Sequence, residues 1–195
     1  MKKILAPAFV LLTLVFCIDF SAHAAQPAAP DKPVTPVPVP KDMLDGTRLV
    51  LKTAGCSVDL PGPGWSWMTY ENAGRNYLCV NAKTFEMYMV AFSELKSDMT
   101  DHHPQSLIAS AKKTMEAHAG KLENDKYEFI ETPGVKKAAK ITFTEVEKTK
   151  KAFVCVWLFN TVEHILVKMH CSSTGTSEPE AFKTMIKSLK MLDPK

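Results

Sequence analysis

The stretch FVCVWLFNTVEHILVKMHC, residues 153–171, decides the fold expected of this chain. Its first half places every second residue in one apolar set: Phe153, Cys155, Trp157 and Phe159. Residues 160–163 are typical of a turn, and the second half repeats the alternation with Ile165, Val167, Met169 and Cys171. Because successive side chains of a β-strand point to opposite faces, the stretch predicts an antiparallel hairpin with one face in the core.

Shorter apolar runs upstream of this hairpin predict the other strands. They span residues 49–51, 56–60, 65–70, 76–81, 85–92 and 139–144. The sequence Pro61-Gly62-Pro63-Gly64 separates two of these runs and indicates a loop. The run 85–92 is apolar on both faces, which favours a position in the middle of a sheet.

Two segments change to the three- and four-residue spacing of an amphipathic helix. The first runs from Pro104 to Lys121 and has an apolar stripe of Leu107, Ile108, Ala111, Met115, Ala119 and Leu122. The second opens at Ser177 with an expected capping box to Glu180, and its stripe is Phe182, Met185, Ile186, Leu189 and Leu192. This order of elements predicts an α+β fold, an antiparallel β-sheet flanked by helices.

The N-terminus has the pattern of a secretory signal peptide. Lys2 and Lys3 precede an apolar run over residues 4–18, which closes on Ala22-His23-Ala24. The run is shorter than the ~20 residues that a spanning helix needs, so no transmembrane segment is expected in the mature chain. The pattern predicts a signal peptide over residues 1–24 and a periplasmic or secreted protein. A lipid anchor at Cys17 is not expected, because the bulky Phe16 precedes it.

Six prolines crowd the next segment, at positions 27, 30, 33, 36, 38 and 40. Each proline fixes its φ angle and lacks a backbone donor, so the segment favours an extended polyproline conformation. We expect a disordered linker over residues 25–42, followed by a single domain over residues 43–195. A tether that holds the domain away from a membrane and a tail without a partner are both consistent with this composition.

Four cysteines follow the expected cleavage site: Cys56, Cys79, Cys155 and Cys171. An even number in an exported chain indicates disulfide bonds, and the wide spacing does not fit the usual zinc frameworks. In the predicted hairpin Cys155 and Cys171 fall on the same face, either directly opposite or one diagonal step apart. We therefore favour a Cys155–Cys171 disulfide and, by elimination, a Cys56–Cys79 disulfide.

The sequence offers few other groups for binding. Trp65, Trp67 and Tyr70 form an aromatic cluster beside the glycine and proline loop, which is either core or a recognition patch. His102-His103, with Asp98 and Asp101 nearby, fits a surface loop before a helix better than a metal site. The net charge of +3 is too small to indicate nucleic-acid binding, and the lysines around Lys140 are expected on a solvated face.

No sequence motif indicates catalysis or a cofactor. The chain contains no P-loop, no dinucleotide-binding glycine pattern, no Gly-x-Ser-x-Gly elbow and no His-Glu-x-x-His motif. We therefore expect no catalytic residue, no resident metal and no cofactor.

The order of the elements resembles the PsbP/Mog-like fold and its bacterial DcrB-type envelope relatives. The segment Val58-Asp59-Leu60-Pro61-Gly62-Pro63-Gly64-Trp65 is similar to that family's opening "F-x-[ILV]-x-[ILV]-P-x-G-W". The segment Phe182-Lys183-Thr184-Met185-Ile186-Lys187-Ser188-Leu189 is similar to its closing "F-x-x-[IM]-[IV]-x-S-[LF]". The resemblance covers residues 56–192; the Pro-Gly-Pro-Gly sequence departs from the family's shorter turn, and the cysteines are not a family hallmark.

The resemblance implies a sheet with helices on its faces and, as a rule, no enzymatic activity. Relatives in this family act as accessory or docking proteins, and no family functional residue maps onto a matched motif here. Together with the leader, this predicts an exported, non-enzymatic accessory or protein-binding domain with a protein partner in the bacterial cell envelope. The alternative is a periplasmic protein that binds a small molecule or a metal.

Overall fold

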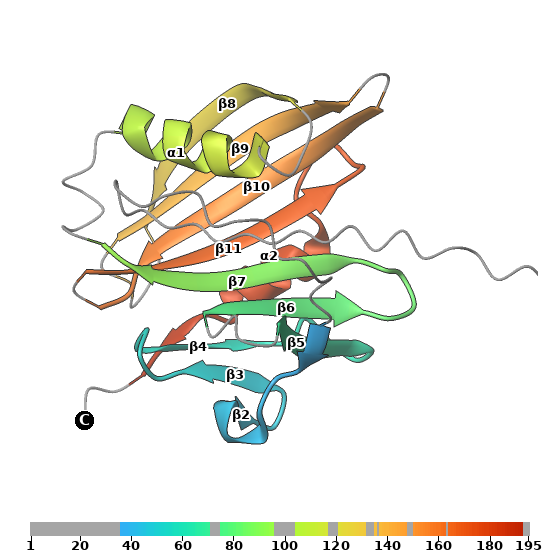
Figure 1. Ribbon diagram of the computed structural model, residues 1–195, viewed down its shortest axis with the longest axis vertical. Helices are drawn as coiled ribbons and strands as arrows, with labels where there is room; N and C mark the ends of the chain where they lie inside the picture. The colour runs from blue at the N-terminus through green and yellow to red at the C-terminus, as the bar shows by residue number, and fades with distance from the viewer. Residues whose placement is uncertain are drawn as a thin grey trace, which may run out of the picture.

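The computed structural model describes residues 36–70, 75–95, 104–116, 121–131, 135, 137–147, 150–162 and 164–192. The expected signal peptide and residues 25–35 lie outside these ranges, so the leader stays a prediction. The described part of the chain forms two antiparallel sheets and two α-helices (Figure 1). None of the described helices is long and apolar enough to cross a bilayer.

The larger sheet has eight strands, and the predicted hairpin lies in its interior. In spatial order these are β1 (Pro36–Pro38), β5 (Trp65–Tyr70), β6 (Asn76–Asn81), β7 (Met87–Glu94), β11 (Ile165–Ser173), β10 (Lys150–Asn160), β9 (Lys137–Glu147) and β8 (Lys121–Ile130). All neighbouring pairs are antiparallel. The hairpin predicted over residues 153–171 is confirmed as β10 and β11. The doubly apolar run is confirmed as the interior strand β7 from Met87 onward, whereas Phe85, which was expected in the strand, lies before it with a positive φ.

The smaller sheet has four strands among the described residues. Its order is β12 (Lys190–Met191), β4 (Cys56–Asp59), β3 (Arg48–Leu51) and β2 (Leu44–Asp45), and a short 3-10 helix, η1 (Lys41–Met43), precedes it. The guanidinium of Arg48 binds both carboxylate oxygens of Asp59, at 2.8 and 3.1 Å, and so joins β3 to β4. The chain returns to this sheet after its last helix, because β12 pairs with β4.

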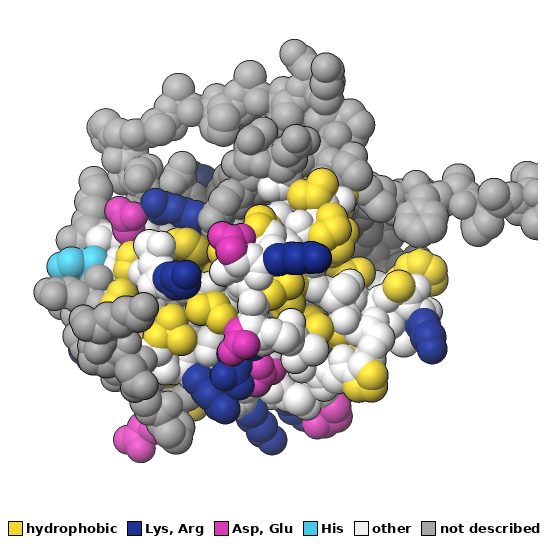
Figure 2. Space-filling view, turned by 90° about the horizontal axis from the view of Figure 1, so that it is seen from below, with side chains coloured by type: hydrophobic (Ala, Val, Ile, Leu, Met, Phe, Trp, Pro, Cys, Tyr) yellow, Lys and Arg dark blue, Asp and Glu magenta, His cyan; other side chains and the backbone are white. Residues whose placement is uncertain are grey.

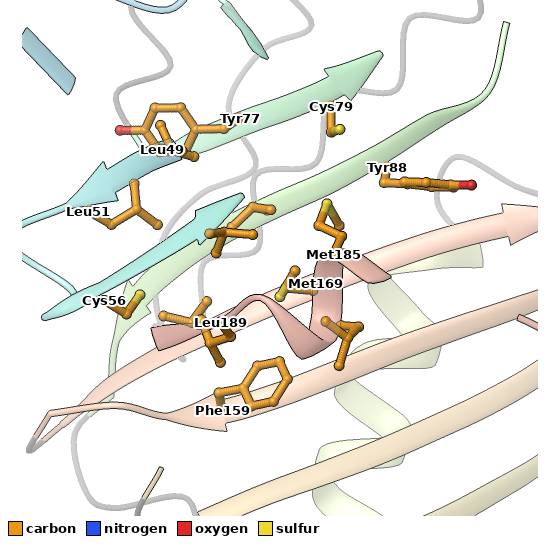
Figure 3. Packing of buried hydrophobic residues seen from close by; sticks show 14 of the residues in the cluster. Leu49, Leu51, Cys56, Tyr77, Cys79, Tyr88, Phe159, Met169, Met185 and Leu189 are labelled. Atoms are coloured by element: carbon orange, nitrogen blue, oxygen red, sulfur yellow. The ribbon is translucent and has the colours of Figure 1, made fainter. Parts of the chain in front are cut away.

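The two helices lie against opposite faces of the larger sheet (Figure 1). Helix α1 (Pro104–Glu116) packs with β8 and its neighbours through the buried side chains of Leu107, Ala111 and Met115. Helix α2 (Glu180–Lys187) buries Phe182, Met185 and Ile186 between the two sheets. Figure 3 shows this second core, with Leu49 and Leu51 of the smaller sheet on one side and Phe159 and Met169 of the larger sheet on the other.

The predicted fold class, an α+β sheet flanked by helices, is wrong, because the described chain is predominantly β. One cause is β8, which the sequence analysis missed. Half of the ten residues of this edge strand are charged, and Leu122 is its one buried residue. Leu122 was expected to belong to the first helix. The other cause is the separate four-stranded sheet, whose strands are too short to reveal which sheet they join.

The last residues of the proline-rich segment belong to the fold. Strand β1 pairs with β5, with Val37 opposite Thr69, and the N–H of Val39 donates to the carbonyl of Trp67 at 3.4 Å. Because backbone groups alternate in direction along a strand, the valine N–H groups face β5 and Pro36 and Pro38 face outward. Proline is tolerated at a sheet edge for this reason. Residues 36–38 and 41–42, which were expected in the linker, thus belong to β1 and η1.

Candidate functional site

The aromatic residues predicted as a possible binding patch are largely part of the core. Trp67 is 5% exposed and donates its indole N–H to the carbonyl of Thr47 at 2.9 Å. Trp65 is partly buried and stacks on Tyr88, with ring centroids 4.8 Å apart. Tyr70 is also buried but belongs to the hydrophobic cluster on the opposite face. The structure therefore brings Trp65 and Trp67 together and separates Tyr70 from them.

All four described cysteines are buried free thiols. Cys155 and Cys171 are directly opposite each other on β10 and β11. Cys56 lies in the smaller sheet opposite Leu51, whereas Cys79 lies in the larger sheet, and Figure 3 shows the two on separate strands. Burial raises the pKa of Cys56 and of Cys79 to about 12, so both are protonated at neutral pH. The two predicted disulfides stay predictions.

The most concentrated polar chemistry in the described chain surrounds the carboxylate of Glu178. This residue lies just before α2, and its side chain is only 8% exposed. Three donors converge on it: Lys140 Nζ at 2.7 Å, Cys155 Sγ at 3.2 Å and the indole N–H of Trp157. The ammonium of Lys140 also lies 5.5 Å from the centroid of the Trp157 ring. We call these four residues, with Cys171, the Glu178 cluster.

The charges of the Glu178 cluster follow from its hydrogen bonds. Burial alone would raise the pKa of Glu178, but the hydrogen bonds from Lys140, Trp157 and Cys155 together lower it. Burial opposes the charge of Lys140, yet its hydrogen bond to Glu178 raises its pKa. Burial, followed by hydrogen bonding with Cys171 and the charge of Glu178, raises the pKa of the Cys155 thiol well above its usual range. At neutral pH the cluster thus holds the carboxylate of Glu178, the ammonium of Lys140 and the protonated thiol of Cys155.

The sequence analysis missed this cluster, although part of its signal was present. Lys140 alternates with Ala139 and Ile141 in the predicted strand, so it shares a face with its cross-strand partner Trp157. We had expected Lys140 on a solvated face, yet its side chain is 20% exposed. The expected capping box is also wrong, since Pro179 is the N-cap residue of α2 and makes no side-chain capping bond. A glutamate beside that helix start was therefore not singled out.

A second notable feature is the turn between β6 and β7. The side-chain oxygen of Asn81 accepts the N–H groups of Lys83 and Thr84, at 2.9 and 3.2 Å. The N–H of Phe85 donates to the Asn81 carbonyl at 2.9 Å. Phe85 has a φ of 59°, a conformation that non-glycine residues rarely adopt, and its side chain is 72% exposed. Since Trp65 pairs with Asn81, the Pro61–Gly64 loop lies at the same end of the sheet.

The histidines show no arrangement for metal binding within the described ranges. His102, His103, Asp98 and Asp101 lie outside these ranges. No group of three or more His, Cys, Asp or Glu side chains among the described residues is placed to hold a metal ion. His170 lies on β11, between Val156 and Met89 on the face that α1 covers, and burial lowers its pKa to about 4. Its imidazole is therefore neutral at pH 7.

Among the described residues, the surface around the smaller sheet has no large area of a single charge. Figure 2 views the molecule from that side and shows apolar side chains interspersed with single basic and acidic ones. The large apolar side chains that are exposed among the described residues are Phe85, Met87 and Phe129. Phe85 and Met87 belong to the β6–β7 hairpin, whereas Phe129 lies on the edge strand β8.

The geometry defines a predominantly β domain with a buried thiol, carboxylate and ammonium cluster. No family model matches the chain, and no curated protein matches its sequence. A protein of Bacteroides thetaiotaomicron VPI-5482, known from a crystal structure at 1.50 Å, shares the fold with a TM-score of 0.52 at 11% sequence identity. The match covers 76% of this chain and 49% of that protein. The chain thus corresponds to about half of that protein, and the likeness concerns the fold alone.

Proposed function

We propose that this chain is an exported, non-enzymatic accessory domain of the bacterial cell envelope that binds another protein through the Phe85 turn. The leader pattern supports export. The resemblance of its opening and closing segments to the PsbP/Mog-like family supports an accessory role.

The exposed phenyl ring of Phe85 is the observation that carries the proposal. A left-handed backbone costs a non-glycine residue about 1–2 kcal/mol, and most of the Phe85 side chain is exposed to solvent. The hydrogen bonds of Asn81 nevertheless hold the turn in this conformation. Backbone strain of this kind is concentrated at functional positions, and aromatic anchors dominate the energetics of protein interfaces.

The Glu178 cluster supports a non-catalytic role. Its carboxylate is buried and accepts hydrogen bonds from Lys140, Trp157 and Cys155, which are themselves core or near-core residues. The raised pKa of Cys155 keeps its thiol protonated at neutral pH, so thiol exchange at this residue is slow, unlike that of an activated catalytic cysteine. These groups are thus employed in holding α2 to the sheet.

The experiment compares two matched exposed phenylalanines. The purified protein, Phe85→Asn and Phe129→Asn are immobilised in equal amounts and exposed to a detergent extract of the source envelope. Asparagine tolerates the left-handed conformation, so Phe85→Asn removes the ring and keeps the turn. Retained proteins are quantified by mass spectrometry.

We expect a protein that the wild type and Phe129→Asn retain equally and that Phe85→Asn retains at least tenfold less. Equal retention by all three forms, or no retention above a blank support, contradicts the proposal. Circular dichroism and thermal unfolding of each variant exclude a folding defect as the cause.

A further inference from the structure

Cys155 and Cys171 have the geometry of a dithiol that can close. They are directly opposite on adjacent antiparallel strands, and both side chains are fully buried. Residues that face each other in this way have Cα atoms about 4.5–5.5 Å apart. That separation falls within the range that a disulfide spans without backbone movement.

The state of these sulfurs changes the hydrogen bonding of Glu178. The Cys155 thiol donates its only hydrogen to Oε1 of Glu178. A disulfide sulfur has no hydrogen to donate. Oxidation would therefore leave the buried carboxylate with Lys140 and Trp157 alone. The S–H group is a weak donor, but its acceptor here is a charged carboxylate, which strengthens the bond, so its loss shifts the equilibrium.

We propose that Cys155 and Cys171 form a redox pair whose thiol–disulfide equilibrium is controlled by Glu178. In the closing step, the electron acceptor is the oxidised, disulfide form of an exported dithiol oxidant. The Cys155–Cys171 bond forms, the oxidant's S–S bond breaks, and the two protons and two electrons of the thiols pass to the oxidant as two new thiols. The inference rests on the proposed export, but not on binding through Phe85.

Formation of the Cys155–Cys171 disulfide also affects helix α2. Glu178 precedes the N-cap residue Pro179, and the helix that follows buries Phe182, Met185 and Ile186 between the sheets. In the reduced form Glu178 connects the start of α2 to β9 and β10 through Lys140, Cys155 and Trp157. In the oxidised form the direct hydrogen bond to Cys155 is absent. The redox state of Cys155 and Cys171 thus changes how strongly the start of α2 is bound to β9 and β10.

The test measures the redox equilibrium of the purified protein in glutathione buffers. Samples start from both the oxidised and the reduced form, are quenched with acid, and Cys155 and Cys171 are assigned by peptide mapping. The variant is Glu178→Gln, and the matched control is Glu180→Gln, two residues away. Glu180 is exposed and pairs with Lys183 instead.

We expect the wild type to form the Cys155–Cys171 disulfide. Loss of the charge at Glu178 weakens the thiol form, so Glu178→Gln shifts the equilibrium toward the disulfide by about tenfold. The salt bridge to Lys140 is lost in both redox states and cancels. Glu180→Gln leaves the equilibrium within twofold of the wild type.

Trp157→Phe provides a second variant of opposite sign. It removes another donor to Glu178, so the oxidised form retains only Lys140 and the equilibrium shifts toward the thiols. The proposal is overturned if Cys155 and Cys171 of the wild type remain thiols in every glutathione buffer. An equilibrium that Glu178→Gln and Trp157→Phe leave unchanged overturns it as well. A readout of binding is not needed, so a failure here is distinct from a failure of the proposed function.

Discussion

The two faces of the larger sheet bury titratable groups in different ways. On the α2 face, the carboxylate of Glu178 remains charged because Lys140 pairs with it. On the α1 face, His170 lies between Val156 and Met89 of the neighbouring strands and is neutral at pH 7, since burial lowers its pKa to about 4. The difference shows that a β-sheet core can accommodate such a group either by pairing its charge or by suppressing it. The two solutions fail under different conditions.

Removal of Lys140, the partner of the buried Glu178 carboxylate, gives the largest expected change in the free energy of unfolding. Lys140→Met removes the ammonium and leaves Glu178 charged inside the core, which costs about 3–5 kcal/mol in the free energy of unfolding. Urea denaturation monitored by tryptophan fluorescence measures the change. Lys183→Met is the matched control, because its pair with Glu180 is exposed and solvent screens it, so the loss is expected to be far smaller than that of Lys140→Met. Similar losses for the two variants would remove the distinction between the faces.

The burial of His170 in its neutral form makes the free energy of unfolding depend on pH. The folded pKa of His170 is about 4 and the unfolded value is 6.5, so the unfolded chain binds more protons between these values. Stability is therefore full above pH 6.5 and is lost as the pH falls toward 4, by up to about 3 kcal/mol. Glu178 also has a lowered pKa, and its contribution is lost only below its usual value of 4.5.

His170→Gln checks this assignment. The variant cannot titrate, so the slope of unfolding free energy against pH between 6.5 and 4.5 should flatten, as measured by urea titrations at fixed pH values. His164→Gln is the control, because His164 is exposed. A slope that persists in His170→Gln would mean that other groups cause it.

The smallest effect concerns an ion pair at the surface of the α2 side. Arg48 and Asp59 are about one-third exposed, at 32% and 31%. Hydrogen bonding with Arg48 lowers the pKa of Asp59, but solvent screens the pair. Arg48→Met is expected to destabilise the fold much less than Lys140→Met, as measured in the same urea assay. A loss as large as that of Lys140→Met would show that partial exposure does not weaken ion pairs here.

The sequence revealed the interior of the larger sheet better than its edges. The alternation over residues 153–171 predicted β10 and β11 because both strands face apolar neighbours on each side. Strand β8 was not predicted, because an edge strand needs few apolar residues. Its charged side chains disfavour pairing with strands of other chains. A positive φ at Asn124 and the register shift between Glu123 and Lys126 interrupt it further.

The candidate site was predictable only in part. The opposition of Cys155 and Cys171 was one of two registers that the hairpin allowed, and the structure has the direct one. Glu178 could not be foreseen, because it comes from a loop far along the chain and its contact with β10 depends on how α2 packs. The exposure of the Phe85 side chain depends on the turn that begins at Asn81. The amino-acid composition does not reveal the backbone geometry of this turn.

Strand β1 has a consequence for how copies of the protein meet. Pro36 and Pro38 present carbonyls but no N–H groups along the outer side of the sheet, while Val37 and Val39 use theirs on β5. A β-strand from a neighbouring molecule would find acceptors there without matching donors. Extension of the sheet by a neighbouring molecule across β1 is thereby disfavoured, and copies of the protein are kept from joining their sheets along this edge.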